Sequence, residues 1–391
     1  MPFVKKSLQD LAIFGNPPAF PAPLHVGRPN IGNREQFLEL IDDILDRKWL
    51  TNNGKYVREF EKAIAAITGA KHCIAVSNGT LGLELAAKAA EIKGEAIVPS
   101  FTFIATAHAL QWLGITPVFA DIDPETHAID PKAVESLITP NTTAIIGVHI
   151  WGESCPVEAL AEIARRHRLT LIFDAAHAFA CSHQGQPIGR FGEAEVFSFH
   201  ATKFINSLEG GAITTDNDEL ARKIRLMKNF GFAGYDRVVS PGTNGKMNEI
   251  SAAMGLTSLA CLDEWIEINY RHYQQYRQEL ADLRGIRLYP FDERERRNYQ
   301  YIILEINETA SQISRDRLLE VLQAENILAR RYFYPGCHKM EPYCSSGQTW
   351  HLPHTERLAS QVISLPTGTA LQSEDISQIC QIIRLAASFE F

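Results

Sequence analysis

Two hydrophobic patterns alternate through the first two thirds of the chain. Short apolar runs rich in β-branched and aromatic residues predict strands, and longer stretches with apolar residues every three or four positions predict helices. The strand-like runs are 73–77, 96–100, 117–122, 142–150, 169–174, 194–200 and 211–216. Strands that alternate with helices are typical of a parallel sheet covered by helices, so we expect an α/β fold with a mostly parallel seven-stranded sheet.

The pattern changes after about residue 250. A long helical stretch is followed by a strand-like run at 298–306, a helix at 314–327, a strand at 328–335 and a last helix at 374–389. This order predicts a smaller α+β domain joined by a long helix. We therefore expect an N-terminal segment and a large domain over residues 1–250, and the linking helix with a small C-terminal domain over residues 251–391.

Composition narrows the class of protein. The 391 residues are 45% hydrophobic and 21% charged, as in ordinary globular proteins, and the net charge of −8 argues against nucleic-acid or anionic-membrane partners. The seven scattered cysteines form no CxxC pair, which favours a reducing compartment and predicts neither a disulfide scaffold nor a zinc site. We expect no metal site. With no run of signal-peptide or membrane-span length, we expect a cytoplasmic protein.

One lysine stands in an apolar, small-residue stretch, FSFHATKFINSLEGGAI. Burying a lone ammonium there costs several kcal/mol unless the lysine is paired or neutralised. Lys203 follows a predicted strand in which Ser198 faces away from the neighbouring phenylalanines. A partly desolvated lysine favours its neutral amine, and the neutral amine attacks an aldehyde to form a Schiff base.

A carboxylate ends the preceding predicted strand, in LIFDAAHAF. Asp174 at the end of a buried strand needs a partner, and a protonated heterocyclic nitrogen is one candidate. A structural aspartate that caps the next helix explains the position equally well. Asp174 and Lys203 together, each just after a buried strand, form the arrangement that a pyridoxal phosphate site requires.

Two further stretches suit such a site. In VSNGTLGLELAAKAA a small-residue turn opens a helix, and the free N–H groups of that helix start favour a phosphate. An ordinary helix cap explains this turn as well. In PSFTFIATAHA an aromatic ring could lie flat on a planar ligand, although a core position is the commoner fate of a phenylalanine.

The order and spacing of several motifs resemble one enzyme family. The motifs are SNGT, PSFTF, DIDPETHAID, GVHIWGESC, FDAAHA, FSFHATK, EGGAITTDND and TNGKMNEISAAMGL. They are similar to the DegT/DnrJ/EryC1/StrS sugar aminotransferases, which depend on pyridoxal phosphate and have the aspartate-aminotransferase-like (fold type I) fold. LAIFGNPPAF, LHVGRPN, RRYFYPGCHKMEPY and LPHTERLASQVISLPTGTA resemble the subgroup that contains the TDP-4-keto-6-deoxyglucose 4-aminotransferase of desosamine biosynthesis.

The resemblance implies roles for the matching residues. Lys203 would bind the cofactor covalently and later move protons, and Asp174 would pair with the pyridine nitrogen. His177, where many members have glutamine, would lie near the ring. Phe103 would stack on the ring, while Gly79, Thr80 and Ser198 would hold the phosphate, together with Asn244 of a neighbouring subunit in a homodimer.

Substrate contacts follow less directly. Trp49 and Asn53 match a segment near the sugar-nucleotide site of the family, although a simple turn also explains the asparagine. Arg330, Tyr332 and His338 are candidates for binding the diphosphate or the carboxylate of the amino donor, because arginine suits both.

The resemblance implies a ping-pong aminotransferase. L-Glutamate would leave its nitrogen on the cofactor as pyridoxamine phosphate and depart as 2-oxoglutarate, and the nitrogen would then reach the 4-keto carbon of a TDP-linked 6-deoxyhexose. Alternatives are a 3-keto sugar, a UDP- or GDP-linked sugar or a cyclitol ketone. A sugar dehydratase of the same family is disfavoured because such enzymes carry histidine in place of the lysine. A non-catalytic sugar-nucleotide sensor would not need Lys203 and Asp174 together.

Overall fold

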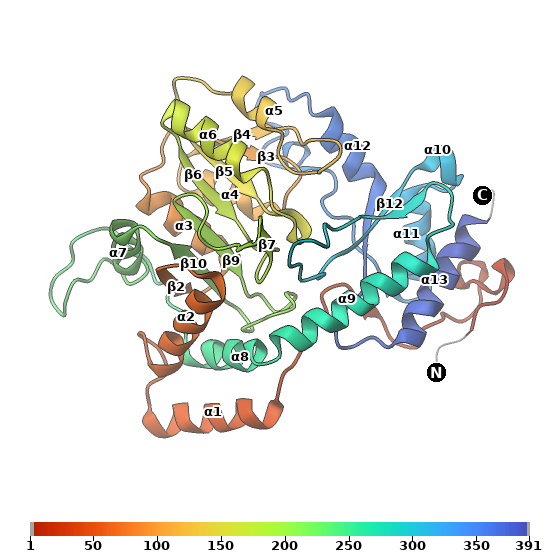
Figure 1. Ribbon diagram of the computed structural model, residues 1–391, viewed down its shortest axis with the longest axis horizontal. Coiled ribbons are helices and arrows are strands. Elements are labelled where there is room, and N and C mark those ends of the chain that lie inside the picture. Colours follow the sequence, from red (N-terminus) through yellow and green to blue (C-terminus); the bar gives the residue numbers. More distant parts are fainter. Residues whose placement is uncertain (1–3, 389–391) are drawn as a thin grey trace.

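The computed structural model describes residues 4–388, and its largest element is a seven-stranded sheet (Figure 1). In spatial order the strands are β2 (His72–Val76), β10 (Gly211–Thr215), β9 (Ala194–Ser198), β6 (Thr170–Asp174), β5 (Thr142–Val148), β3 (Glu95–Pro99) and β4 (Thr116–Ala120). Strand β10 runs antiparallel to the other six strands, which are parallel to one another. The predicted mostly parallel sheet is confirmed, and each strand lies within a predicted run or one residue from it.

Helices cover both faces of the sheet. One face carries α3 (Gly79–Ala89), α4 (Ala105–Trp112) and α7 (Asp218–Met227); the other carries α2 (Lys55–Thr68), α5 (Pro131–Ser136), α6 (Val157–His167) and α8 (Glu249–Leu259). Alternate residues of β2 are buried under helices of opposite faces. Ile74 and Val76 join the core under α3, whereas Cys73 and Ala75 join the core under α2. Alternate strand residues point to opposite faces, so a strand covered on both faces is apolar throughout.

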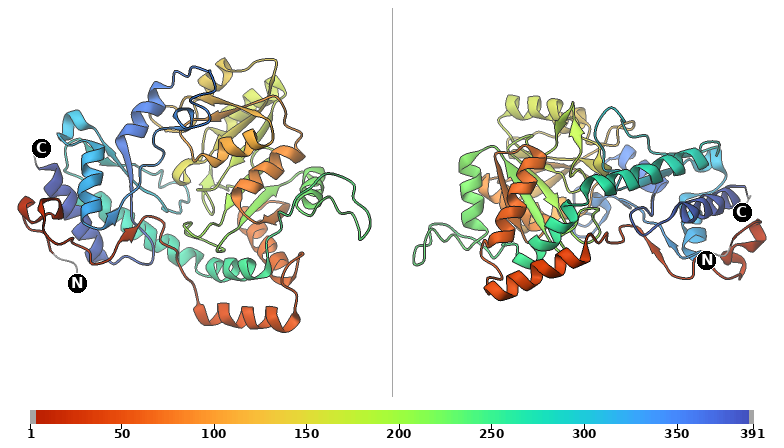
Figure 2. Two further views of the ribbon diagram at one scale, coloured as in Figure 1. Left: turned by 180° about the vertical axis from the view of Figure 1, so that it is seen from behind. Right: turned by 60° about the horizontal axis from the view of Figure 1, so that its bottom comes forward.

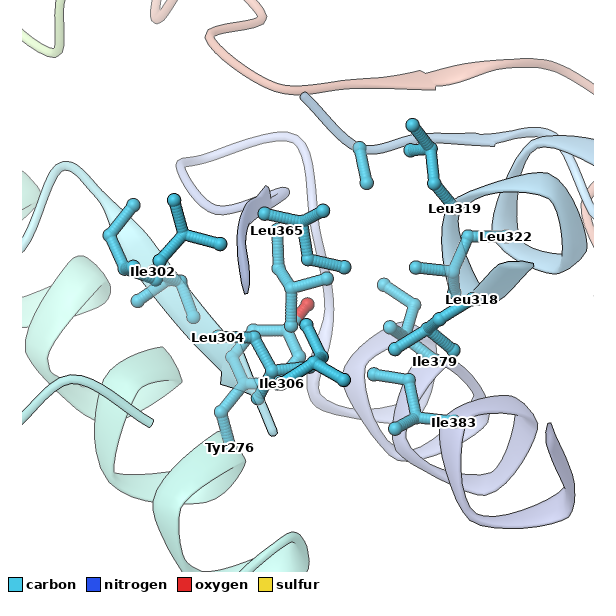
Figure 3. Close-up of a cluster of buried hydrophobic side chains, with 14 of the residues drawn as sticks. Tyr276, Ile302, Leu304, Ile306, Leu318, Leu319, Leu322, Leu365, Ile379 and Ile383 are labelled. Atoms are coloured by element: carbon cyan, nitrogen blue, oxygen red, sulfur yellow. The ribbon is translucent and has the colours of Figure 1, made fainter. Parts of the chain in front are cut away.

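The C-terminal lobe follows a long helical stretch that breaks at Ala260 and Cys261 into α8 and α9 (Leu262–Glu279) (Figure 1). Its antiparallel sheet consists of β11 (Ile286–Leu288), β12 (Ile302–Ile306) and β14 (Val362–Leu365). The other α-helices of this lobe are α10 (Glu308–Ser311), α11 (Arg315–Ala324), α12 (Pro353–Gln361) and α13 (Ser373–Ala387). Figure 3 shows strand and helix side chains meeting in one core, Leu304 and Ile306 from β12 with Leu318 from α11 and Ile379 from α13.

The strand predicted at 328–335 is wrong. Pairing is limited to β13 (Ile327–Leu328) and a bridge from Arg330 to Ser364, after which the chain turns. Tyr332 and Phe333 stack on each other at 5.1 Å and both line a cavity. The aromatic residues that suggested a strand pack there against other rings instead of extending a sheet.

The N-terminal segment packs on the C-terminal lobe (Figure 2). Leu11 and Phe20 are buried in the core of that lobe, and β1 (Leu24–His25) pairs in parallel with β13. The buried Lys5 ammonium lies 3.3 Å from the buried Glu325 carboxylate. This N-terminal arm, residues 4–33, is followed by α1 (Arg34–Arg47), which packs on α8.

Two further short strands, β7 (Ser182–His183) and β8 (Gln186–Pro187), form a hairpin. Within residues 4–388, no helix combines the length and the apolar character that crossing a bilayer requires.

Candidate active site

A cavity of about 730 Å³ lies beyond the carboxyl ends of β5, β6 and β9, next to the start of α3. In an open α/β sheet this is where ligands bind. The predicted residues that line it are Gly79, Thr80, Phe103, Asp174, His177, Ser198, Lys203, Arg330 and Tyr332. The four stretches singled out in the sequence therefore converge, and the C-terminal lobe supplies part of the wall.

Asp174 ends β6 and is only 6% exposed. Its Oδ2 accepts a hydrogen bond of 2.8 Å from the Thr106 hydroxyl, and its Oδ1 accepts one of 3.1 Å from the Ala176 N–H. Burial raises the pKa of this carboxyl, while both hydrogen bonds and the nearby Lys203 oppose the rise. A cationic ligand group beside Asp174 would stabilise the charged form.

Lys203 sits in the turn after β9, half-buried at the cavity wall. Its Nζ donates a hydrogen bond of 3.0 Å to the Tyr301 hydroxyl. Burial lowers the pKa of Lys203 to about 8, and the negative charge of Asp174 acts in the opposite direction. Close to neutral pH, this lysine therefore has a far larger fraction of neutral, nucleophilic amine than an exposed lysine.

His177 is buried between two aromatic rings. Its ring centroid lies 4.3 Å from that of Tyr301 and 5.7 Å from that of Phe333. Its Nδ1 accepts a hydrogen bond of 3.3 Å from the Trp151 N–H, which leaves the proton of the neutral ring on Nε2. Burial, with a smaller contribution from Lys203, holds the pKa of His177 well below its usual value, so the ring is neutral.

The turn before α3 combines a helix cap with an open helix start. The Asn78 side chain caps the helix by accepting a hydrogen bond of 2.8 Å from the Leu81 N–H. A Cβ atom at Gly79 would lie 3.1 Å from the Cβ of Ser198, so glycine lets the two segments approach closely. The first N–H groups of a helix attract anions, and a serine hydroxyl stands beside them here.

The glycine pair in EGGAI has a structural reason. A Cβ at Gly211 would lie 2.7 Å from the Asn78 carbonyl carbon, and one at Gly210 would lie 2.0 Å from the Ser207 hydroxyl oxygen. Gly211 therefore lets β10 start directly under the turn that opens α3, while Gly210 leaves room for Ser207. Gly211 thus shapes the candidate phosphate site without lining its cavity.

The two phenylalanines of PSFTF have different environments. Phe101 is 1% exposed and packs edge-on against Trp151 and Phe333. Phe103 is 55% exposed and lines the cavity. Phe103 is thus the aromatic residue available to a bound ring, whereas Phe101 supports the wall.

Four predicted residues do not line this cavity: Trp49, Asn53, Asn244 and His338. Trp49 and Asn53 lie between α1 and α2, where Asn53 has a left-handed φ of 62° and forms part of a turn. Asn244 is exposed in the segment after α7. Both ring nitrogens of His338 have partners, Ser100 at 2.7 Å and Glu356 at 3.4 Å, so His338 links β3 to α12 instead of facing a ligand.

The sequence missed several residues of the site, among them Thr106 and Tyr301. Thr106 lies on α4 inside a quoted motif, but nothing in that motif indicated a contact with Asp174. Tyr301 precedes β12 in the other lobe and resembles any aromatic residue near a strand. In the sequence, the one feature that sets Tyr301 apart is the partly polar run NYQY before an apolar strand.

Comparison with known proteins identifies the family. The model of the DegT/DnrJ/EryC1/StrS aminotransferase family matches residues 32–384. The chain belongs to this family. Over 362 residues it is 37% identical to the dTDP-4-amino-4,6-dideoxy-D-glucose transaminase of Shigella dysenteriae, covering 93% of this chain and 98% of the relative.

Two other relatives support this assignment. The chain is 36% identical over 361 residues to the GDP-perosamine synthase of Caulobacter vibrioides, covering 91% of this chain and 96% of the relative. A crystal structure of DesI in the presence of its TDP-sugar product matches with a TM-score of 0.94 and 51% identity, over 98% of this chain and 97% of that chain. The predicted family, the aspartate-aminotransferase-like fold and the expectation of an aminotransferase are confirmed.

Proposed function

We propose that this aminotransferase uses pyridoxal phosphate to move the amino group of L-glutamate to the 4-keto carbon of a TDP-linked 6-deoxyhexose. TDP-4-keto-6-deoxyglucose is the favoured acceptor, which would give TDP-4-amino-4,6-dideoxyglucose. The main structural support is that one cavity contains both Lys203, with its lowered pKa, and the buried Asp174 carboxylate.

The residues present fit the cofactor. Asp174 is a buried carboxylate with room for a cationic partner, and the start of α3 beside Ser198 offers N–H groups and a hydroxyl to a phosphate. Phe103 has an exposed ring for the flat face of a pyridine. When bound, the cofactor would supply an electron sink that stabilises negative charge on a substrate carbon.

The chain's own groups supply positioning and proton transfer. Lys203 would act as general acid and base, because an amine with a pKa of about 8 holds and releases a proton near neutral pH. In the second half-reaction its Nζ would deliver the proton to C4 of the sugar. Thr106 and the Ala176 N–H orient the Asp174 carboxylate, and the neutral His177 offers its Nε2 proton as a hydrogen-bond donor.

The identity of the acceptor rests on relatives. DesI was crystallised with its TDP-sugar product, and the Shigella relative is named for a dTDP-linked 4-amino sugar. The Caulobacter relative is named for a GDP-linked product, so another nucleotide remains an alternative. Arg330 and Tyr332 line the cavity from the C-terminal lobe and are our candidates for binding the diphosphate or the donor carboxylate.

We further propose a homodimer with shared active sites. Large apolar side chains are exposed on the chain near the cavity and on the segment after α7: Phe103, Leu208, Phe230, Phe232, Tyr235 and Val238. Exposed apolar residues in such number are typical of an interface. A second copy placed there would bring its Asn244, which lies on the same segment, toward the cavity.

The test is turnover by purified protein with L-glutamate and a panel of keto sugars that differ in nucleotide and keto position, followed by mass spectrometry. The proposal predicts a TDP-amino sugar and an equal amount of 2-oxoglutarate. No reaction with TDP-4-keto-6-deoxyglucose would exclude the favoured acceptor. A deoxygenated product without glutamate consumption would indicate a dehydratase, and no turnover of any sugar would favour a sensor.

A further inference from the structure

The C-terminal lobe makes a direct contact with the lysine of the candidate active site. Tyr301, which directly precedes β12, accepts a hydrogen bond of 3.0 Å from Lys203 Nζ through its hydroxyl. The lysine nitrogen also lies 5.6 Å from the centroid of the tyrosine ring. Tyr301 is 6% exposed, and its ring packs at 4.3 Å against that of His177.

A phenol suits this position because its hydroxyl both accepts and donates hydrogen bonds. It accepts from the lysine ammonium and donates to the neutral amine, so one oxygen serves both protonation states. Burial raises the pKa of Tyr301 well above its usual value, which keeps the phenol protonated. The hydroxyl is thus a neutral partner over the whole range in which Lys203 titrates.

Other groups around the lysine act differently. Asp174 on β6 is negative and favours the ammonium, while His177 is neutral. His200 and Glu209, from the segment after β9, also line the cavity, and the His200 Nε2 lies 3.5 Å from a carboxylate oxygen of Glu209. Within residues 4–388, the bond to the Tyr301 hydroxyl is the one hydrogen bond found for the Lys203 Nζ.

We infer that Tyr301 is a positioning residue for Lys203: it holds the free amine in place between proton transfers, in both protonation states, from the opposite lobe. The inference deepens the proposed function, since it rests on the proton-transfer role of Lys203. It also gives the C-terminal lobe a part in the chemistry besides binding substrate. Both lobes then position Lys203. Its backbone belongs to the large domain, and its side-chain nitrogen is bound by Tyr301 of the C-terminal lobe.

The test measures the protonation of Lys203 directly. Full-length protein without cofactor is labelled with trace acetic anhydride at several pH values, and peptide mass spectrometry reports the labelling of Lys203 relative to the exposed Lys62. Only the neutral amine reacts, so the midpoint of labelling plotted against pH gives the pKa of Lys203. We expect this pKa at about 8 in the wild type. In Tyr301→Phe both protonation states lose their partner, but the ammonium loses the stronger bond, because hydrogen bonds to charged groups contribute more than those between neutral groups. The midpoint should therefore fall by about one unit, which raises labelling at pH 7 about fivefold.

Tyr299→Phe is the matched control. Tyr299 lies in the same segment, but its ring packs against Tyr270 and Tyr273. In Tyr299→Phe the pH midpoint of Lys203 labelling should therefore equal that of the wild type. An unchanged midpoint in Tyr301→Phe, or an equal shift in both variants, would overturn the inference. Because no turnover is measured, a missing aminotransferase activity would reject the proposed function and leave this result standing, and the reverse also holds.

A second readout separates positioning from substrate binding. With the favoured sugar and glutamate, Tyr301→Phe should lower kcat about tenfold and leave KM within twofold, because the loss affects proton transfer and not substrate binding. A raised KM with unchanged kcat would show that Tyr301 binds substrate, which would overturn its assignment as a positioning residue.

Discussion

Thr106 on α4 donates a hydrogen bond of 2.8 Å to the buried carboxylate of Asp174 at the end of β6. The bond lowers the pKa of Asp174 against the effect of burial, so it helps to keep this carboxyl charged. A second hydroxyl, that of Thr102, lies 3.0 Å from the Thr106 hydroxyl and extends the network. The charge state of Asp174 therefore depends on a helix that contributes no charged group to the site.

We expect Thr106→Val to weaken cofactor binding. Without the hydroxyl the pKa of Asp174 rises, and the charged form needed to pair with a pyridinium nitrogen becomes less favourable. A hydrogen bond to a charged group contributes about 1.5–3 kcal/mol, so the Kd for pyridoxal phosphate should rise at least about tenfold. Titration of cofactor-free protein, followed by absorbance, measures it. Thr106→Ser retains the hydroxyl and should bind nearly as the wild type does; equal affinity of all three proteins would contradict this role.

Lys203→Ala should abolish both the near-visible absorption of the loaded protein and its turnover. The proposed covalent anchor and the proposed general acid–base group would be lost together, and loss of general acid–base catalysis alone costs about 10²–10⁴-fold in rate. Lys203→Arg is the control for charge, because it keeps a cation but has no neutral amine near pH 7. A variant that kept its colour, or an active arginine variant, would refute the covalent role.

Shared active sites predict complementation between two inactive variants. Lys203→Ala and Asn244→Ala should each be nearly inactive as pure dimers. In a mixed dimer one site combines an intact Lys203 with the intact Asn244 of the other copy. Co-refolding the two variants in equal amounts should restore about a quarter of wild-type turnover, because about half of the dimers are mixed and each holds one intact site. Recovery no greater than the sum of the separate variants would show that the two residues do not act on one site across a dimer.

Removing the buried cation of the N-terminal arm should destabilise the protein. Glu325 accepts hydrogen bonds of 2.6 Å from the N–H groups of Ala12 and Ala19, and Lys5 lies 3.3 Å from the same carboxylate. Breaking a buried ion pair costs about 3–5 kcal/mol, so Lys5→Ala should lower the free energy of unfolding by that order. Urea denaturation followed by circular dichroism gives the value. Lys6→Ala changes an exposed neighbour and should remain within about 0.5 kcal/mol of the wild type.

The sequence was informative wherever neighbours along the chain decide the structure. All strands of the central sheet follow from apolar runs, since a strand buried on both faces must be apolar throughout. The sequence also predicted that Lys203 and Asp174 share one site, because Asp174 ends one strand, Lys203 follows another, and the carboxyl ends of parallel strands share one edge. Local pattern and topology together were enough for this part of the site.

Contacts between distant segments could not be predicted in this way. Nothing local to Tyr301 indicates that its hydroxyl meets a lysine of the other lobe, and nothing in the arm around Leu11 indicates which lobe buries it. The residues at 328–335 were misassigned because aromatic residues favour strands only where a partner strand is present. For Asn244, the proposed partner is a second chain, which a single sequence does not describe.

The pairing of β1 with β13 joins two segments that lie far apart in the sequence, with Leu24 beside Ile327. During synthesis the N-terminal segment leaves the ribosome before the large domain, and the surface that binds it is made only after the whole large domain has emerged. The large domain can therefore complete its sheet while the C-terminal lobe still lacks its core. Closing so long a loop slows the last step of folding, and until then the lysine nitrogen of the active site has no tyrosine to hold it.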